Sequence, residues 1–231
     1  MSPPATRVPG ESLVDDRGPR HRSDRASASA PTIGVLALQG DVLEHLRLLE
    51  QAGARGVTVR RADDLAGLDG LVLPGGESTT IGLLLERHGL AEPLRRTVAD
   101  GFPVLGTCAG AILLAERVVQ HDGRASDQPR VGGLDVTARR NAFGRQVASF
   151  EADLVVAGLE APLRAVFIRA PWFEELGPDV EPLATVATPV GDVPVVVRHG
   201  ALVASAFHPE LTDDARLHRL FVADAVARTR A

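Results

Sequence analysis

A single cysteine lies between two glycines, in a pattern that suits nucleophilic catalysis. Cys108 is the only cysteine of the 231-residue chain, within Gly106-Thr107-Cys108-Ala109-Gly110. The apolar residues 103–107 predict a buried strand, and residues 109–119 predict a helix. The flanking glycines allow a sharp turn that lifts the thiol above the sheet edge, to a helix N-terminus where the helix dipole favours thiolate. The backbone N–H of Ala109 would point towards an oxyanion. An ordinary buried cysteine is the alternative.

A cysteine nucleophile needs a base, and His208 has a suitable setting among the seven histidines. It follows the apolar residues 201–207, which predict a strand, and Glu210 comes two positions later. Residues two apart in an extended chain project to the same side, so Glu210 could hold one imidazole nitrogen while the other faces the thiol. A strand-to-helix turn without a catalytic role is the alternative. Three other histidines fall in predicted helices and are interpreted as lying on solvated faces: His45, His88 and His218.

A second glycine-rich turn also follows a predicted strand, residues 69–73. It reads Pro74-Gly75-Gly76-Glu77-Ser78-Thr79-Thr80. Its two glycines allow backbone N–H groups to approach a ligand closely, and ligands bind at strand ends of open α/β sheets. A plain tight turn between strand and helix is the alternative.

Strands and helices alternate in the first part of the chain, which predicts a parallel sheet covered on both faces. The expected strands are residues 33–38, 56–60, 69–73 and 103–107. The expected helices are residues 41–53, 78–88, 92–100 and 109–119, the first with a capping box formed by Asp41 and Glu44 and an apolar face that includes Leu43. Further strands are expected at 134–140, 149–155, 165–168, 194–198 and 201–207, with a hairpin at His199-Gly200 and a closing helix capped by Thr212. These patterns predict one α/β domain, residues 32–231, with antiparallel additions.

Composition limits the possible functions. The net charge of -5 argues against nucleic-acid binding by bulk charge, and no apolar run is long enough for a membrane span. Lysine and tyrosine are absent, so a Schiff-base lysine or a phosphate-loop lysine is excluded. Residues 1–31 are rich in proline, serine and arginine and poor in large aliphatic residues, which predicts a disordered N-terminal tail.

The glycine-rich turn, the cysteine turn and the late His-Pro-Glu together resemble class I glutamine amidotransferases, the type with a Cys–His–Glu triad. Further stretches resemble, more narrowly, the glutaminase subunits of pyridoxal 5′-phosphate synthase, over about residues 32–230. These stretches are Val35-Leu36-Ala37-Leu38-Gln39-Gly40-Asp41, Arg140-Asn141-Ala142-Phe143-Gly144-Arg145-Gln146, Phe167-Ile168-Arg169-Ala170-Pro171 and Phe207-His208-Pro209-Glu210-Leu211-Thr212.

The resemblance implies a flavodoxin-like fold and a defined activity. The family hydrolyses L-glutamine to glutamate and ammonia. The ammonia passes to a separate (β/α)8 synthase subunit, which makes pyridoxal 5′-phosphate from ribose 5-phosphate and glyceraldehyde 3-phosphate. The family also implies an assembly with twelve copies of each subunit, a cytoplasmic location, and no cofactor or metal.

The resemblance also implies roles for particular residues. Cys108 would be the nucleophile, with His208 and Glu210 completing the triad. The backbone of Gly76 and Ala109 would form the oxyanion site. The L-glutamine site would comprise Gly75, Gly76, Glu77, Arg140, Ile168 and Arg169.

The chain departs from the family pattern in its N-terminal tail and in a polar loop, residues 122–130, that is longer than usual. Three other functions remain as alternatives: another class I glutaminase subunit, a cysteine hydrolase of the α/β-hydrolase class, and a non-catalytic scaffolding subunit. The α/β-hydrolase pattern normally places its acid before the histidine, whereas Glu210 follows His208.

Overall fold

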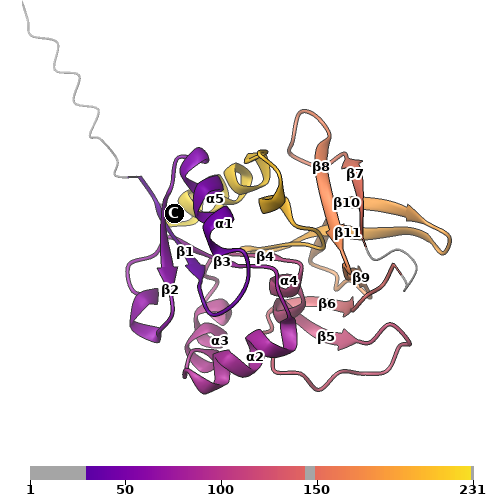
Figure 1. The fold of residues 1–231 in the computed structure, drawn as a ribbon. Helices are drawn as coiled ribbons and strands as arrows, with labels where there is room; N and C mark the ends of the chain where they lie inside the picture. Colours follow the sequence, from indigo (N-terminus) through magenta and orange to yellow (C-terminus); the bar gives the residue numbers. More distant parts are fainter. Residues whose placement is uncertain (1–29, 144–148, 230–231) are drawn as a thin grey trace, which may run out of the picture.

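The computed structural model describes residues 30–143 and 149–229. Its centre is a seven-stranded sheet in the order β10-β11-β12-β4-β3-β1-β2 (Figure 1). Five strands run parallel: β1 (Thr32–Leu36), β2 (Arg55–Val59), β3 (Gly70–Leu73), β4 (Val104–Thr107) and β12 (Leu202–Ser205). Antiparallel β11 (Gly191–His199) and β10 (Val180–Thr188) extend one edge. The predicted α/β class with a mostly parallel sheet is confirmed.

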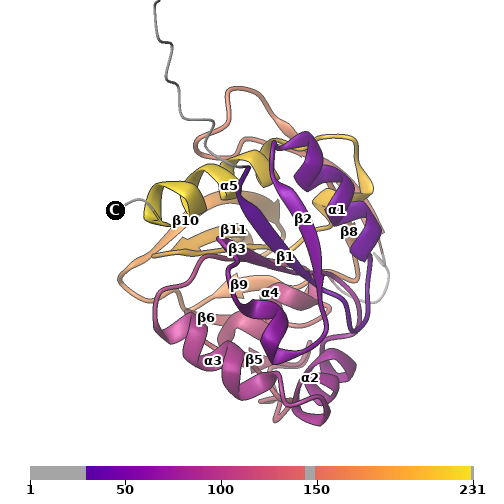
Figure 2. The ribbon, with the colours of Figure 1, turned by 90° about the vertical axis from the view of Figure 1, so that its left-hand side faces the viewer.

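Helices cover both faces of this sheet (Figure 2). On one face lie α1 (Val42–Gln51) and α5 (Arg216–Thr229), and on the other α2 (Ser78–Arg87), α3 (Ala91–Ala99) and α4 (Ala109–Leu114). Successive strand residues enter opposite cores: Val72 packs in the cluster that includes Leu49 and Phe221, whereas Leu71 and Leu73 pack in the other. This two-sided burial explains why the central strands are nearly continuous apolar runs.

Smaller elements complete the fold. A three-stranded sheet contains β5 (Ala115–Val119), β6 (Leu134–Arg139) and β9 (Trp172–Glu174), and β7 (Ser149–Leu154) pairs with β8 (Leu163–Ile168) as an antiparallel hairpin. The 3-10 helices are η1 (Ala62–Leu65) and η2 (Pro209–Leu211). No helix among the described residues is long and apolar enough to cross a membrane.

The helix predicted at residues 109–119 is wrong beyond Leu114. Ala115 has an extended backbone, φ -63° and ψ 138°, and the chain continues as β5. Parallel pairing with β6 joins Ala115 to Leu134 and Val119 to Arg139. β-Branched residues fit a paired strand, and this long-range pairing outweighs the local helical pattern.

Other boundaries also differ from the prediction. Asp41 precedes α1 but makes no side-chain cap hydrogen bond, and Leu43 is 74% exposed, so it does not belong to the apolar face. The last helix begins at Arg216, whose N–H donates to the carboxylate of Asp214, and not near Thr212. The strands β9 and β10 were not predicted from the sequence, whereas the predicted hairpin between β11 and β12 is present.

Parts of two sequence predictions lie outside the described residues. The predicted disordered tail ends at residue 31, and only its last two residues are described. Of these, Pro31 accepts a hydrogen bond from the backbone N–H of Arg55 at 2.8 Å. Gly144, Arg145 and Gln146 of the family motif also lie outside.

An aromatic cluster fastens the β7–β8 hairpin to the rest of the molecule. Phe150 and Phe167 stack with ring centroids 4.5 Å apart, and Phe143 meets both edge-on. Phe167 also contacts Phe207, the residue before His208, and the His208 N–H donates to the Val166 carbonyl at 2.9 Å. The hairpin therefore fixes the backbone that carries His208.

We expect Phe167→Ala to lower the free energy of unfolding by about 3–5 kcal/mol, because it empties a fully buried aromatic site. Denaturant unfolding measures the loss, with Val155→Ala as the control, because Val155 is 78% exposed and should change stability by less than about 0.5 kcal/mol. A loss for Phe167→Ala as small as that of the control would contradict the anchoring role of the cluster.

Candidate active site

Three adjacent parallel strands bring the candidate residues to one edge of the sheet. Leu73 of β3 is in register with Gly106 of β4, and Thr107 of β4 is in register with Ser205 of β12. Parallel strands end at the same edge, so the segments that follow them emerge side by side. These segments carry the glycine-rich turn, Cys108 and His208.

The turn at Cys108 is strained and requires both of its glycines. Cys108 has φ 46° and ψ -102°, in the left-handed range of φ that non-glycine residues rarely adopt. A Cβ on Gly110 would overlap the Leu73 carbonyl oxygen, and one on Gly106 would lie 2.8 Å from the Ala111 nitrogen. The Cys108 N–H donates to the Ser205 carbonyl at 2.8 Å. The strand ends thus hold the thiol at the start of α4, which begins at Ala109.

His208 and Glu210 form a close buried pair. His208 Nδ1 lies 2.7 Å from Glu210 Oε1, and the two residues are 6% and 1% exposed. Burial alone would lower the pKa of His208. Hydrogen bonds to Cys108 and Glu210, together with the charges of both partners, outweigh burial and raise the pKa to about 10. The ring is therefore an imidazolium at neutral pH, between the Cys108 sulfur and the Glu210 carboxylate.

The glycine-rich turn packs directly against this pair. A Cβ on Gly75 would overlap the His208 ring, so only glycine fits there. Gly76 has φ 141°, and its neighbour Glu77 donates its backbone N–H to Gln39 Oε1 at 2.9 Å. The turn is thereby held between His208 and the segment that follows β1.

Glu77 and Arg140 form one wall of the site. Glu77 caps α2, and its carboxylate accepts hydrogen bonds from the backbone N–H groups of Thr79 and Thr80. Burial acts to raise the pKa of Glu77, but these bonds and that of the Thr80 hydroxyl lower it to about 2. Arg140 Nη2 lies 2.9 Å from Glu77 Oε1. This ion pair was not predicted from the sequence, and it already engages part of the Arg140 guanidinium.

A cleft of about 490 Å³ opens above the thiol. Seven predicted site residues line it: Gly76, Glu77, Cys108, Arg140, Ile168, Arg169 and His208. The other three, Gly75, Ala109 and Glu210, are not among its lining residues. The lining also includes six residues not predicted for the site: Gln39, Gly40, Asp41, Ser78, Ile112 and Asn141. Gln39 to Asp41 follow β1, and this position at a strand end could have identified them as site residues from the sequence.

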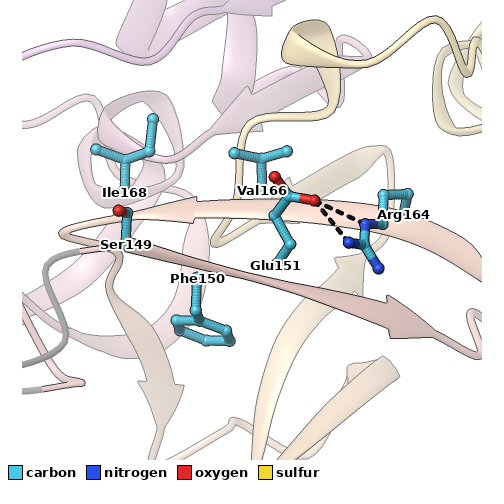
Figure 3. A pocket seen from close by; sticks show the side chains of 6 residues that line it. All are labelled: Ser149, Phe150, Glu151, Arg164, Val166 and Ile168. Carbon is cyan, nitrogen blue, oxygen red and sulfur yellow. Dashed lines mark hydrogen bonds and ion pairs between the residues drawn. The ribbon is translucent and has the colours of Figure 1, made fainter.

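Ile168 and Arg169 reach the cleft from the end of β8. Figure 3 shows Ile168 and Val166 on one side of the hairpin and Phe150 on the other. The side that carries Phe150 belongs to the aromatic cluster described above. Ile168, on the opposite side, lines both the cleft and a second hollow on the hairpin. Arg169 has φ 44°, so the chain turns sharply after the strand and leaves its side chain exposed at the cleft.

Two histidines behind the site are buried, and their predicted solvated positions are wrong. His45 and His218 are both 0% exposed, whereas His88 is exposed as predicted. His45 lies three and four residues before buried Leu48 and Leu49, a spacing that places all three on one helix face. From the sequence alone, that spacing could have indicated that His45 is buried.

One group of side chains in the described part of the chain has the spacing of a metal site. Asp41, His208 and Glu210 present ligand atoms within 4.8 Å of one another. His208 Nδ1 already faces Glu210 at hydrogen-bond distance. The hydrogen bond between His208 and Glu210 accounts for the closeness of these two groups without an ion.

Comparison with known proteins identifies the family. The model of the SNO glutamine amidotransferase family matches residues 35–227. The chain belongs to the SNO glutamine amidotransferase family. A protein of Parafrankia sp. (strain EAN1pec) named pyridoxal 5′-phosphate synthase subunit PdxT is 65% identical over 195 residues, which cover 84% of this chain and 93% of the relative. The protein of the same name from Acidothermus cellulolyticus is 58% identical over 206 residues, 88% of this chain and 98% of the relative.

Solved structures agree with this membership in the SNO family. A crystal structure of a glutamine amidotransferase, 50% identical, superposes with a TM-score of 0.77 and covers 84% of this chain and 98% of its own. PurLQS from Thermotoga maritima, 16% identical with a TM-score of 0.57, covers 87% of this chain and 100% of its own and shows the shared fold alone. The family and the class I glutamine amidotransferase fold predicted from the sequence are confirmed.

The His208 ring of this SNO-family protein should remain protonated far above neutral pH. We expect NMR of protein with 15N-labelled histidine to give a titration midpoint near pH 10. Glu210→Gln should lower the midpoint, because the amide keeps a hydrogen-bond acceptor but removes the negative charge. Since the folded-state pKa lies above the ordinary value of 6.5, the stability that this proton contributes is complete below pH 6.5 and is lost as the pH rises through 10.

Glu151→Gln serves as the control for this titration, because Glu151 pairs with Arg164 on the hairpin. It should leave the His208 midpoint unchanged. A wild-type midpoint at or below 6.5 would contradict the imidazolium assignment.

Proposed function

We propose that this chain hydrolyses L-glutamine to L-glutamate and ammonia, with Cys108, His208 and Glu210 as its catalytic triad. The observation that carries the proposal is that Cys108 and His208 follow neighbouring strands and line one open cleft, where Glu210 holds the imidazole from behind. The matching glutamine amidotransferase family model supports the choice of substrate, and relatives named pyridoxal 5′-phosphate synthase subunit support the choice of pathway.

The reaction begins at the thiolate of Cys108, which attacks the carbonyl carbon of the glutamine side-chain amide. The C–S bond forms as the carbonyl π pair moves to oxygen, and backbone N–H groups of Gly76 and Ala109 stabilise the resulting oxyanion. His208 then gives its proton to the nitrogen, the C–N bond breaks, and ammonia leaves a γ-glutamyl thioester.

Water completes the cycle. The neutral His208 takes a proton from a water molecule, whose oxygen attacks the thioester carbonyl. Collapse of the second tetrahedral intermediate expels the Cys108 thiolate and releases glutamate, with His208 again an imidazolium facing Glu210. No metal takes part in these steps.

The cleft offers partners for the amino-acid end of the substrate. Arg169 makes no ion pair with another described residue, so its guanidinium is available for the substrate α-carboxylate. Glu77 is an anion at neutral pH, and half of its side chain is exposed, so it suits the α-ammonium. Arg140 holds Glu77 in place and adds positive charge beside it.

We also propose that the ammonia passes to a synthase subunit, in a hetero-oligomer with twelve copies of each subunit, in the cytoplasm. The synthase would use it to make pyridoxal 5′-phosphate from ribose 5-phosphate and glyceraldehyde 3-phosphate. Exposed apolar residues beside the site support a docked partner: Leu43 follows cleft-lining Asp41 closely and is 74% exposed, and Leu211, next to Glu210, is 44% exposed.

Cys108→Ser tests this function. We expect glutamine-dependent ammonia release to fall to less than about one per cent of wild type, because a serine hydroxyl is far less acidic and here lacks a strong base. Free ammonium should restore pyridoxal 5′-phosphate formation by a complex of the variant with the synthase, because the synthase site is unaltered.

Two outcomes would count against the proposal. If Cys108→Ser still released ammonia, Cys108 would not be the nucleophile. If wild type released no ammonia from glutamine with the synthase present, glutamine would not be the substrate. Hydrolysis of esters in place of glutamine would favour the α/β-hydrolase alternative.

A further inference from the structure

Two buried histidines extend the hydrogen-bonded chain behind Glu210. His45 of α1 and His218 of α5 come from helices that lie side by side in both ribbon views (Figures 1 and 2). His45 Nδ1 lies 2.9 Å from His218 Nε2. His45 Nε2 lies 3.4 Å from Glu210 Oε2 and 3.3 Å from Thr107 Oγ1. The mechanism above uses neither histidine.

Both rings are neutral at neutral pH. Burial, with the charges of His218 and His208, lowers the pKa of His45 well below its ordinary value of 6.5. Burial lowers the pKa of His218 to about 4. Each ring therefore carries one N–H, and the contact between them needs one donor and one acceptor. Only two arrangements satisfy this condition.

In the first arrangement both rings carry hydrogen on Nδ1. His45 then donates to His218, and the lone pair of His45 Nε2 can accept from the Thr107 hydroxyl at 3.3 Å but also faces the Glu210 carboxylate at 3.4 Å. The buried His218 Nδ1–H has no acceptor among the described residues. This arrangement combines electrostatic repulsion with an unpaired buried donor, and both are unfavourable.

In the second arrangement both rings carry hydrogen on Nε2. His218 donates to His45, and the His45 Nε2–H faces Glu210 Oε2. Only the lone pair of His218 Nδ1 lacks a partner in the described structure. Glu210 Oε2 has no hydrogen-bond partner among the described residues, and His45 Nε2 is 3.4 Å away, so an N–H at this position faces an unpaired carboxylate oxygen.

We propose that His45 is a positioning residue, which donates its Nε2–H to Glu210 Oε2 while His218 fixes the His45 tautomer. The chain of donors then runs from His218 to His45 to Glu210, and His208 donates to the other oxygen of the same carboxylate. Glu210 is held by both oxygens, which keeps Oε1 aimed at His208 Nδ1. The kinetic part of this inference rests on the glutaminase activity proposed above; the tautomer part does not.

The tautomers give a test that needs no activity. Long-range 1H–15N NMR correlations of 15N-histidine-labelled protein distinguish Nδ1–H from Nε2–H, and His45→Gln and His218→Gln assign the signals. We expect both wild-type rings to carry hydrogen on Nε2 at neutral pH. Hydrogen on Nδ1 of both rings would overturn the proposal.

Kinetics test the action through Glu210. With the synthase present, His45→Phe should lower kcat for glutamine hydrolysis about tenfold or more, with KM within about twofold, because it removes one donor to a buried charge. His45→Gln, which keeps an N–H at a similar reach, should recover most of the rate. His121→Phe is the control, because His121 is exposed in a loop and should retain the wild-type rate.

A double-mutant cycle separates positioning from general damage to the fold. If His45 acts through Glu210, His45→Phe should cost little further rate in a Glu210→Gln background. An equal fold-loss in both backgrounds, or a wild-type rate for His45→Phe, would overturn the proposal. If wild type itself releases no ammonia, the proposed function fails and the tautomers alone decide this inference.

Discussion

The buried contact of His208 with Glu210 is the interaction on which the rest of the site depends. Charges taken out of water are costly unless they are paired and hydrogen-bonded, so the surroundings must supply partners on every side. Glu210 Oε1 accepts a hydrogen bond from His208 Nδ1 at 2.7 Å, and the Cys108 side chain interacts with the other side of the ring. This pairing keeps His208 protonated at neutral pH, so that the ring can donate a proton to the leaving nitrogen in the proposed reaction.

The sheet and its turns place the residues that make this contact. The register of β3, β4 and β12 brings three turns together, and the strained backbone of Cys108 raises the thiol to the imidazole. Gly75 leaves room for the ring, and the stacked aromatic residues hold the hairpin that binds the His208 backbone. The surrounding structure maintains the strain at Cys108, since Gly106 and Gly110 on either side are packed too closely for any residue with a Cβ.

The sequence alone predicted the parts that depend on local rules. A few neighbouring residues are enough to interpret the glycines around Cys108, the apolar strand runs and the His-Pro-Glu sequence after a strand. The change from α4 to β5 at Ala115 could not be read in this way, because pairing with distant β6 decides it. The ion pair of Arg140 with Glu77 joins residues far apart in the chain, so spacing gave no indication of it. His45 carried a usable signal in its alignment with Leu48 and Leu49, but a polar residue type favoured the solvated interpretation.

Covalent trapping tests the central claim, that Cys108 attacks the side-chain carbon of glutamine, most directly. The wild-type chain, with the synthase present, is treated with 6-diazo-5-oxo-L-norleucine, a glutamine analogue with an electrophile at the reacting carbon, and then examined by intact and peptide mass spectrometry. We expect one adduct, located on Cys108, formed more slowly when L-glutamine is added and more slowly in His208→Asn. An unmodified Cys108 after prolonged treatment, or an adduct on another residue that glutamine does not suppress, would contradict the account.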